Sequence, residues 1–438
     1  MTENPLFGDH QIGRLLSDEA RYRDMVQIEA ALASVQADLG IIPEESARQI
    51  AKFAKSFRVE GAILAERTGL DGVPVPALLA EFRKQMTEAG LGDHAEYVHR
   101  GPTSQDIMDT AFVLCLQRTL AVMDERLKEL IARLARAAHE HRKTIIAART
   151  RNRIATPTTL GCRIAGWASP LIRHRQRLSN LRPRLFVVSL AGASGNLSAF
   201  EGHGLATEAA LAKRLGLGAA GAPWHSARDN LAELASLMAL ISGSLGKMAQ
   251  DLLLSAQIDE GISAGSGGGS STMPHKTNPT LQEAVVALAR INAGDLGHVM
   301  DAMIHAQERE GSAWFRESLV LERMFVTAGA GLRHGIRLSG TIKVDENRNT
   351  RVFTDNRGLM MAEAASLVLA DRFGLASARD IVKDACRVAV AEGRPLKEAL
   401  VARVTDAESI DWDRIFDPAG WIGESEALID RLLESLEG

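Results

Sequence analysis

The sequence predicts an all-α protein built around a bundle of long helices. Aromatic residues make up only 4% of the 438 residues, while Ala and Leu, which lose little side-chain entropy in a helix, are abundant. Proline is absent between Pro102 and Pro157 and between Pro279 and Pro395, so helices can run long in both windows. An apolar seam from Leu231 to Ser255 alternates steps of three and four residues, which predicts one long amphipathic helix.

A helix of about 30 residues spans about 45 Å and needs long neighbours to bury it. Two segments are candidates for these neighbours, one from Ser104 to about Lys143 and one from Thr280 to about Ala306. The heptad-like seam suggests a bundle that extends beyond one chain and therefore an oligomer, with a seam buried inside a monomer as the alternative. Strand signals are few, and Phe186–Leu190 is the one short β-branched patch.

The chain is too long for one compact core. Boundaries are expected near His99–Pro102 and near the polar stretch Lys343–Arg351. They define an N-terminal helical domain (1–101), a central long-helix bundle domain (102–345) and a C-terminal helical domain (346–438).

The bulk properties exclude several classes of function. A net charge of −4 leaves no basic footprint for nucleic acid or an anionic membrane. The N-terminal residues lack the pattern of a secretory signal, and no run of about 18 apolar residues predicts a membrane span. The three dispersed cysteines, Cys115, Cys162 and Cys386, are expected to be buried thiols in a reducing, cytoplasmic compartment.

The loop Ala264–Asn278, which reads AGSGGGSSTMPHKTN, is the first of three segments that suggest chemistry. Its glycines favour neither a helix nor a stable strand, and it matches neither the Rossmann fingerprint nor a Walker loop. A flexible linker is the alternative, but Pro279 follows at the preferred first position of a helix. Lys276 and Asn278 then lie beside a helix N-terminus, where the peptide dipoles favour an anion.

The second segment is Tyr97–Thr110, with the sequence YVHRGPTSQDIMDT. Thr103 and Asp106 fit a capping box just after Pro102, which predicts a helix start. The hydroxyl and backbone N–H groups of Thr103 and Ser104 would then face any anion at that helix start.

The third segment is Ala148–Gly161, with the sequence ARTRNRIATPTTLG. Arg149, Arg151 and Arg153 occupy alternate positions, and alternate residues of an extended chain face one side. An arginine cluster suits bidentate recognition of carboxylates, with a merely solvated surface as the alternative.

The stretch GSSTMPHKTNP, from Gly269 to Pro279, resembles the signature of the fumarase, aspartase and adenylosuccinate lyase superfamily. The other two segments resemble the first and second conserved regions of this superfamily, and the resemblance covers essentially the whole chain. It implies a three-domain all-α fold whose central bundle forms a multi-helix core in a homotetramer. It also implies active sites to which three subunits contribute.

The resemblance implies roles for individual residues. Ser270 inherits the role of catalytic base on the carbon acid. Lys276 and Asn278 inherit the binding of the substrate carboxylate that becomes an aci-carboxylate. The residues that match the HxGxTSQD form of the first region, and inherit its active-site and substrate-binding roles, are His99, Thr103, Ser104 and Gln105.

The chain departs from the lyase pattern RTHxQxAxP, because the histidine is Arg151 and the glutamine is Arg153. Arginine does not deprotonate in proteins and cannot protonate a leaving group as a general acid. A cycloisomerisation has no separate leaving group, since a carboxylate of the substrate closes onto its own double bond. Three further stretches resemble the 3-carboxy-cis,cis-muconate cycloisomerase branch: Pro223–Leu234, Ala306–Glu317 and Asp417–Asp430.

The expected function is therefore that of a cycloisomerase, an intramolecular lyase of aromatic catabolism of the protocatechuate and β-ketoadipate type. The expected substrate is 3-carboxy-cis,cis-muconate or a close analogue such as 3-sulfomuconate, and the product is the corresponding muconolactone. The cations expected to hold its acid groups are Arg151, Arg153, Arg228 and Arg316, with Arg309 as a further candidate.

Two alternatives remain open at this stage. One is a C–N or C–O lyase of the same superfamily that releases fumarate, with His99 and His225 as the remaining proton donors. The other is a non-enzymatic scaffold that keeps the bundle without the chemistry. No metal or cofactor is expected, because His139 and His141 do not share a helix face and no Cys/His ligand spacing occurs. The expected partners are a small polycarboxylate and further copies of this chain.

Overall fold

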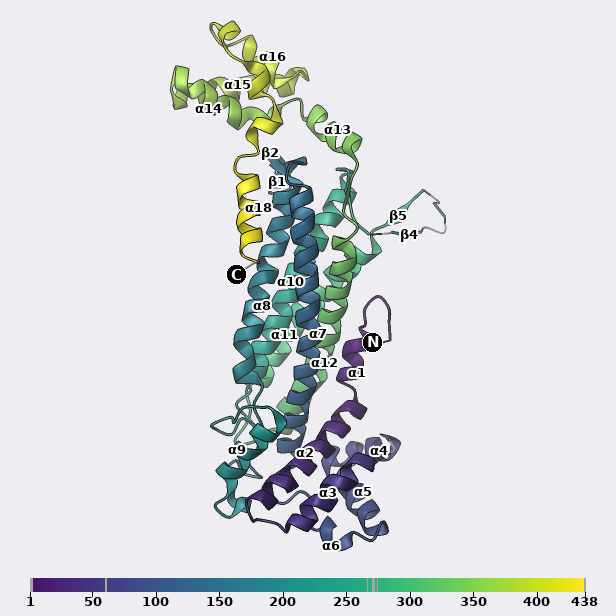
Figure 1. Cartoon of the computed structure of the whole chain (residues 1–438). Coiled ribbons are helices and arrows are strands. Elements are labelled where there is room, and N and C mark those ends of the chain that lie inside the picture. Colours follow the sequence, from purple (N-terminus) through teal and green to yellow (C-terminus); the bar gives the residue numbers. More distant parts are fainter. Residues whose placement is uncertain (1–2, 60, 266, 270–271, 274, 437–438) are drawn as a thin grey trace. The chain divides into compact units, whose positions relative to one another are not determined.

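The chain is almost wholly helical in the computed structural model, which describes residues 3–59, 61–265, 267–269, 272–273 and 275–436 (Figure 1). The predicted all-α class is confirmed. The chain forms two compact units. Unit 1 comprises Met1–Arg126, His174–Gly243 and Leu288–Leu332, and unit 2 comprises Leu127–Arg173, Ser244–Ala287 and Arg333–Gly438. The division into three domains stays a prediction.

Five long helices contribute residues to both units. They are α7 (Ser104–Glu140), α8 (Leu160–Leu185), α10 (Asp229–Gln257), α11 (Thr280–Ala302) and α12 (Gly311–Ser339). The predicted helix starts at Ser104 and Thr280 are confirmed, and every residue of the predicted seam on α10 is at most 3% exposed. By length and composition α10 could also cross a membrane, but 56% of its most apolar window is buried, as in a core helix.

Small residues and buried amides hold these helices together within each unit. In unit 1 the Asn292 side chain on α11 donates to Ser242 on α10 at 2.7 Å and accepts from Thr327 on α12 at 2.6 Å. In unit 2, Gly335 on α12 lies so close to α7 and α10 that a Cβ there would meet the side chain of Leu130 at 3.2 Å. Such packing explains why long helices with few aromatic residues still bury their apolar faces.

The N-terminal part of unit 1 is a cluster of shorter helices around an aromatic core. Phe57 and Phe82 pack edge to face with ring centroids 4.9 Å apart, and Phe53 lies beside both. The shorter elements of this unit are α1 (His10–Leu15), α2 (Asp18–Asp38), α3 (Glu44–Ser56), α4 (Gly61–Asp71), α5 (Val75–Glu88), α6 (Gly92–Ala95), η1 (Ser198–Phe200) and α9 (Gly204–Leu215).

Unit 2 carries three short antiparallel strand pairs among its described residues. They are β1 (Ile145–Thr150) with β2 (Arg153–Thr159), β3 (Ile262–Ser263) with β6 (Lys343–Val344), and β4 (Gly268–Gly269) with β5 (Thr277–Asn278). Its C-terminal elements are α13 (Glu346–Asn356), η2 (Leu359–Met361), α14 (Ala362–Phe373), α15 (Leu375–Glu392), α16 (Leu396–Val401), η3 (Ala407–Ser409), α17 (Trp412–Ile415), η4 (Pro418–Trp421) and α18 (Ser425–Glu434).

The strand predicted at Phe186–Leu190 is wrong. This segment makes a single isolated bridge, in which Val187 pairs with Gly218. Val188 and Leu190 instead pack into an apolar cluster with Phe200. A segment with one bridge partner cannot form a ladder. The β-branched residues of this segment are therefore explained by their burial and not by strand pairing.

Candidate active site

Asp106 anchors the start of α7 in unit 1. Its buried carboxylate accepts hydrogen bonds from the backbone N–H groups of Thr103, Ala191 and Gly192, each at 2.9 Å. The same carboxylate lies 2.7 Å from Nε2 of His225. The predicted helix cap is therefore confirmed for the Asp106 side chain, which also fixes the loop after α8 against the beginning of α7.

Thr103 lies beside a guanidinium group. Its hydroxyl oxygen accepts from Arg309 at 3.3 Å, and a second nitrogen of Arg309 donates to the Ala193 carbonyl at 3.3 Å. Ser104 follows as the first residue of α7. The structure thus brings Thr103 together with Arg309, so a cation and a helix N-terminus both favour an anion near this hydroxyl.

His99 is held in a fixed position. Its backbone has a positive φ of 61°, which is unusual for a residue other than glycine. Its Nδ1 lies 2.6 Å from Oε1 of Glu29, whose side chain is only 3% exposed. This contact orients the ring, and the active-site role of His99 stays a prediction.

Arg228 is buried between two carboxylates of unit 1. Its guanidinium donates to Asp109 at 2.8 Å and to Glu317 at 2.9 Å, and its side chain is 1% exposed. Burial opposes the charge of Arg228, but these two carboxylates outweigh it and raise its pKa. Substrate contact by Arg228, as predicted, would require a substrate carboxylate to displace Asp109 or Glu317.

Gln105 belongs to the same buried layer. It is fully buried, and its amide donates to Asp109 at 3.1 Å and to the His225 carbonyl at 2.9 Å. Its predicted substrate-binding role stays a prediction, and the contacts that the structure provides are those of a residue that positions its neighbours.

Arg316, on α12, is half exposed and already paired. It forms an ion pair with Asp301 and a hydrogen bond with Nδ1 of His298 at 2.9 Å. Its charge is therefore partly offset on the helix surface. A direct role of Arg316 toward substrate stays a prediction.

The arginine segment of unit 2 is a hairpin, so the prediction of an extended chain with three arginines on one side is wrong. Thr150 pairs with Arg153, and the two residues between them, Arg151 and Asn152, have φ values of 49° and 62°. Two left-handed residues form the tight turn that suits the twist of a two-stranded ribbon. Arg151 consequently lies exposed at the tip, whereas Arg149 and Arg153 lie on opposite strands.

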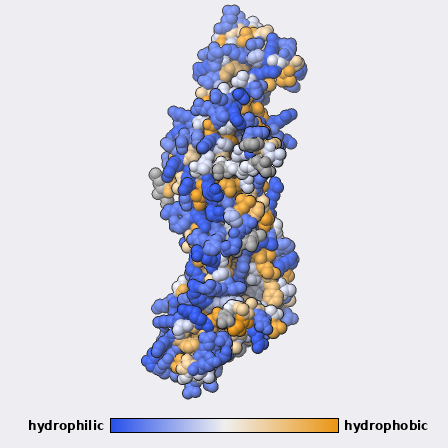
Figure 2. All heavy atoms as spheres, turned by 90° about the vertical axis from the view of Figure 1, so that its right-hand side faces the viewer, coloured by the Kyte–Doolittle hydropathy of each residue, from blue (hydrophilic) through white to orange (hydrophobic). Residues whose placement is uncertain are grey.

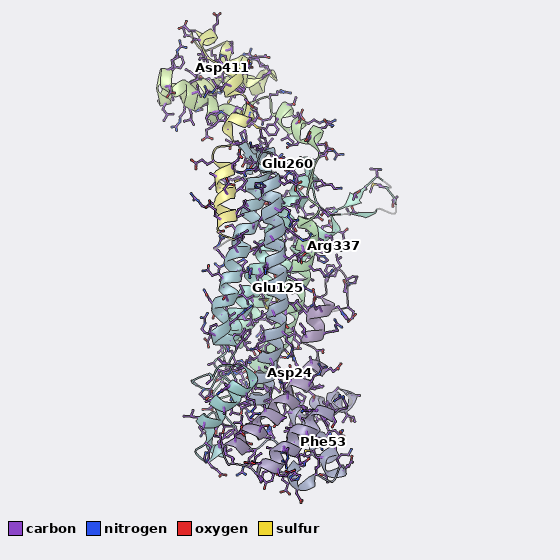
Figure 3. The ribbon with its side chains drawn as sticks, viewed as in Figure 1. Asp24, Phe53, Glu125, Glu260, Arg337 and Asp411 are labelled. Carbon is purple, nitrogen blue, oxygen red and sulfur yellow. The ribbon has the colours of Figure 1, made fainter. Side chains whose placement is uncertain are left out.

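A buried carboxylate fastens this hairpin to its neighbours in unit 2. Glu260 (Figure 3) is 1% exposed and lies 3.7 Å from Arg149 and 3.4 Å from Arg163. The Ser255 hydroxyl donates to the same carboxylate at 2.9 Å. Glu260 therefore ties the hairpin to α8 and to the end of α10, just before the glycine-rich loop begins.

The glycine-rich loop forms a narrow hairpin of its own. Gly268 pairs with Asn278 and Gly269 pairs with Thr277, so the prediction that these glycines would not form a strand is wrong for this two-residue ladder. The hydrogen bonds between the backbones of β4 and β5 hold these glycines in an extended conformation, although glycine has no side chain that favours a strand. Lys276 is exposed.

The predicted catalytic residue, Ser270, lies outside the described residues. Just beyond the hairpin, the Pro279 carbonyl accepts from the Glu283 N–H at 3.1 Å. Pro279 thus caps α11, one position earlier than predicted.

We expect Gly267→Ala to break this hairpin, because a Cβ there would lie 2.0 Å from the Thr277 side chain and 2.7 Å from the Asn278 carbonyl oxygen. Gly269→Ala is the matched control, since no atom of the described residues lies within 4 Å of its Cβ position. Amide hydrogen exchange across residues 264–279 should rise in Gly267→Ala and stay near wild type in Gly269→Ala. Equal exchange in both variants would contradict a hairpin that depends on close backbone approach.

Several network residues were not identified from the sequence. The motifs assigned no role to Asp109, Glu317 or Glu260, because the arginines that each of them contacts lie far away in the chain. Glu317 lies 89 residues from Arg228, and Asp109 lies 119 residues from it. The resemblances at Tyr97–Thr110, Pro223–Leu234 and Ala306–Glu317 each contain one member of this group, but they did not show that the three side chains meet.

The cysteines and acidic clusters offer no alternative chemistry among the described residues. All three cysteines are free, and Cys115 is buried while Cys162 and Cys386 are partly exposed. Burial and the neighbouring Asp24 raise the pKa of Cys115 to about 12, so its thiol is a poor nucleophile. In the described part of the chain, no group of three or more His, Cys, Asp or Glu residues could hold a metal.

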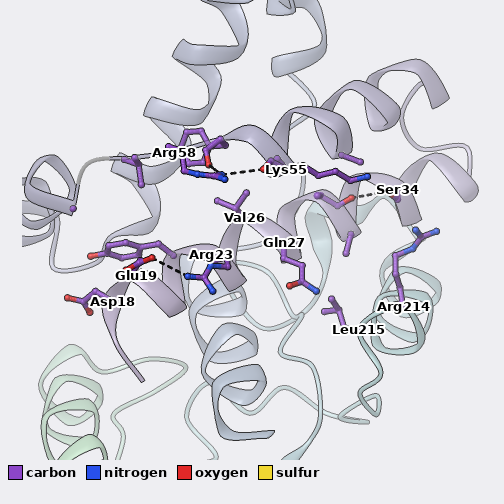
Figure 4. A pocket seen from close by; sticks show the side chains of 18 residues that line it. Asp18, Glu19, Arg23, Val26, Gln27, Ser34, Lys55, Arg58, Arg214 and Leu215 are labelled. Atoms are coloured by element: carbon purple, nitrogen blue, oxygen red, sulfur yellow. Dashed lines mark hydrogen bonds and ion pairs between the residues drawn. The ribbon is translucent and has the colours of Figure 1, made fainter. Parts of the chain in front are cut away.

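A cavity of about 1240 Å³ opens between α2, α3 and α9 in unit 1 (Figure 4). Its walls are largely apolar, and the predicted site residues are not among those that line it. The cationic residues on its lining are Arg23, Lys55, Arg58 and Arg214. Arg23 pairs with Glu19 at 3.2 Å and Arg214 with Asp38 at 2.8 Å, so half of this positive charge is offset.

The helical fold and the three motif segments together define a class of protein. Residues 10–292 match the sequence family described as Lyase, and the chain belongs to this family.

Individual relatives and a solved structure show which members of this family the chain resembles. The chain is 39% identical over 426 residues to 3-carboxy-cis,cis-muconate cycloisomerase from Pseudomonas aeruginosa, covering 96% of this chain and 93% of that protein. It is 33% identical to trans-aconitate decarboxylase 1 from Mycosarcoma maydis, covering 99% of this chain and 88% of that protein. The crystal structure of 3-carboxy-cis,cis-muconate lactonizing enzyme from Pseudomonas putida matches with a TM-score of 0.91 at 33% identity, covering 98% of both chains. The predicted resemblance to this branch is confirmed.

Proposed function

We propose that the protein is a cycloisomerase that closes 3-carboxy-cis,cis-muconate, or a close analogue, to the corresponding muconolactone. One observation carries this proposal. The motif GSSTMPHKTNP leads into α11 in a chain that has Arg151, and not histidine, at the tip of the hairpin of β1 and β2. The relative from Pseudomonas aeruginosa, at 39% identity over nearly the whole chain, carries the name of this activity.

The proposed reaction is an intramolecular addition. One carboxylate oxygen of the substrate forms a bond to an alkene carbon, and the alkene electrons move into a conjugated acid group as an aci-carboxylate. Ser270 delivers a proton to carbon and the aci-carboxylate returns to a carboxylate, which completes the lactone. The serine alkoxide then takes up a proton from water, so the whole reaction consumes one proton. Lys276, Asn278 and backbone N–H groups stabilise the developing charge, and loss of one such donor costs about 2.7–4 kcal/mol.

The arginine residues suit binding better than proton transfer. Arg151 is exposed at the tip of a hairpin that Glu260 fastens through Arg149, so its guanidinium is presented on a fixed backbone. Such a cation can bind a carboxylate in a bidentate way but cannot protonate a leaving group. The relative named trans-aconitate decarboxylase 1 acts on another unsaturated tricarboxylic acid, which supports a polyanionic alkene as the substrate class.

The substrate preference can be measured directly. We expect 3-carboxy-cis,cis-muconate or 3-sulfo-cis,cis-muconate to lose its conjugated diene absorbance when the enzyme is added, and the kcat/KM ratio identifies the preferred substituent. The product should be a lactone with no release of fumarate. Fumarate release from a succinyl adduct, with no consumption of either muconate, would instead favour the alternative lyase function.

We further propose that the enzyme acts in the cytoplasm as a homotetramer whose subunits share active sites. Hydrophobic side chains reach the surface among hydrophilic ones on the face shown in Figure 2. In unit 1 the long helices α10, α11 and α12 expose several large apolar residues, namely Leu240, Ile291, Met300, Phe315 and Leu319. Burial of such residues against copies of the same chain is a reasonable driving force for assembly.

A further inference from the structure

The loop between α11 and α12 contains two buried N–H donors that have no acceptor in the described part of the protein. They are Nε2 of His305 and Nε of Arg309. A buried donor without an acceptor is destabilising and uncommon in folded proteins. Two such donors within five residues of one loop point to an anionic ligand that would satisfy them.

The His305 ring is oriented by its own loop. Nδ1 accepts a hydrogen bond from the backbone N–H of Glu310 at 3.4 Å, so the ring proton resides on Nε2. Burial, helped by the positive charge of Arg228, lowers the pKa of His305. The ring is therefore neutral at pH 7, and Nε2–H is available as a hydrogen-bond donor.

His305 differs in this respect from the two histidines that the sequence suggested. Nδ1 of His99 faces Glu29 at 2.6 Å, and Nε2 of His225 faces Asp106 at 2.7 Å. Each of those rings already has a carboxylate partner within unit 1. Nε2 of His305, in contrast, has no hydrogen-bond partner among the residues that the structure describes.

The same loop joins His305 to the predicted anion site of unit 1. Arg309 donates to the Thr103 hydroxyl at the start of α7. His305 lies within electrostatic range of Arg228, Asp109 and Glu310. An anion bound near Thr103 would thus contact Arg309, and His305 lies on the same loop as Arg309.

We propose that His305 is a substrate-binding residue whose Nε2–H donates a hydrogen bond to an acid group of the polyanionic substrate, alongside Arg309. The inference rests on the proposed function, because it takes its ligand from there. A neutral imidazole can hold an anion without transferring a proton, so its contribution is to binding and not to the proton transfer assigned to Ser270.

The test compares His305→Phe, which keeps a ring but removes both nitrogens, with His305→Gln, which keeps an N–H donor. His10→Phe is the control, because His10 lies on α1 with 57% of its side chain exposed. We expect His305→Phe to raise KM for the muconate by roughly ten- to a hundredfold with a smaller change in kcat, as expected for loss of a hydrogen bond to a charged group. His305→Gln should recover most of that loss, and His10→Phe should match wild type.

A second measurement separates this inference from the proposed function. Calorimetric binding of propane-1,2,3-tricarboxylate, a saturated triacid that cannot lactonise, should weaken in His305→Phe and recover in His305→Gln. If wild type binds this triacid but turns over neither muconate, the proposed function fails while the binding comparison still decides the role of His305. Equal affinity in wild type and His305→Phe, or a wild type that binds no triacid, would overturn the inference.

Discussion

Ser270→Ala should lower kcat for lactone formation by about 10²–10⁴-fold, the usual contribution of a positioned general acid or base. In the proposed mechanism this hydroxyl is the group that passes a proton to carbon, and alanine has nothing to replace it. KM should change little, because the acid groups of the substrate are held by cations such as Arg151 and Lys276. The measurement is the initial rate of diene loss at saturating muconate.

Ser271→Ala is the matched control for this substitution, since it removes the adjacent hydroxyl of the same loop. We expect it to retain most of the activity. Mixing inactive Ser270→Ala and Arg151→Ala chains adds a test of shared sites, because a mixed tetramer would contain some sites with both residues intact. Full turnover in Ser270→Ala would contradict the mechanism, and absence of regained activity in the mixture would contradict sharing between subunits.

Periodic features of the fold could be read from the sequence. The seam from Leu231 to Ser255 predicts α10, and its burial is confirmed because helical spacing alone decides which side chains share a face. Helix starts at Ser104 and Thr280 were predictable from local capping chemistry. In contrast, the turn at Arg151–Asn152 contains no glycine that would have predicted it. The alternating arginines therefore suggested one continuous extended segment.

The candidate site could be predicted only as far as its local motifs reach. The motifs identified Thr103 and Lys276, but they did not show that the Thr103 hydroxyl accepts a hydrogen bond from Arg309, which lies 206 residues away in the chain. Pairings such as Arg228 with Glu317, or Glu260 with Arg149, join segments far apart in the chain, and the motifs that contain the two arginines do not show which carboxylate each one meets. A sequence shows which residues are charged, but it does not show which residue of opposite charge each one contacts in the folded protein.

Arg228→Met should destabilise the protein by about 3–5 kcal/mol, the loss typical when one partner of a buried ion pair is removed. Methionine fills similar space but leaves Asp109 and Glu317, whose side chains are at most 5% exposed, without their cation. The measurement is the urea midpoint of unfolding at constant pH. Arg184→Met is the control, because Arg184 and its partner Glu233 lie on the surface and should matter little.

The loss should also depend on pH in a defined direction. Burial raises the pKa of Glu317, and Arg228 opposes that rise, so removal of Arg228 should raise this pKa further. A carboxyl group whose pKa is higher in the folded than in the unfolded state binds its proton more tightly when folded. Its stabilising contribution is present below the unfolded pKa of about 4.3 and is lost as pH rises through the folded pKa. Arg228→Met should therefore be closer to wild type at pH 5 than at pH 8.

A rescue variant separates this structural role from substrate binding. Combining Arg228→Met with Asp109→Asn and Glu317→Gln removes both stranded charges and should recover much of the lost stability at pH 8. If Arg228 instead serves mainly to bind substrate, Arg228→Met would keep the wild-type urea midpoint while KM rises. The two roles therefore predict different results. A structural role lowers the urea midpoint of Arg228→Met, because a buried cation with two carboxylate partners stabilises the fold without any ligand. A binding role changes KM alone.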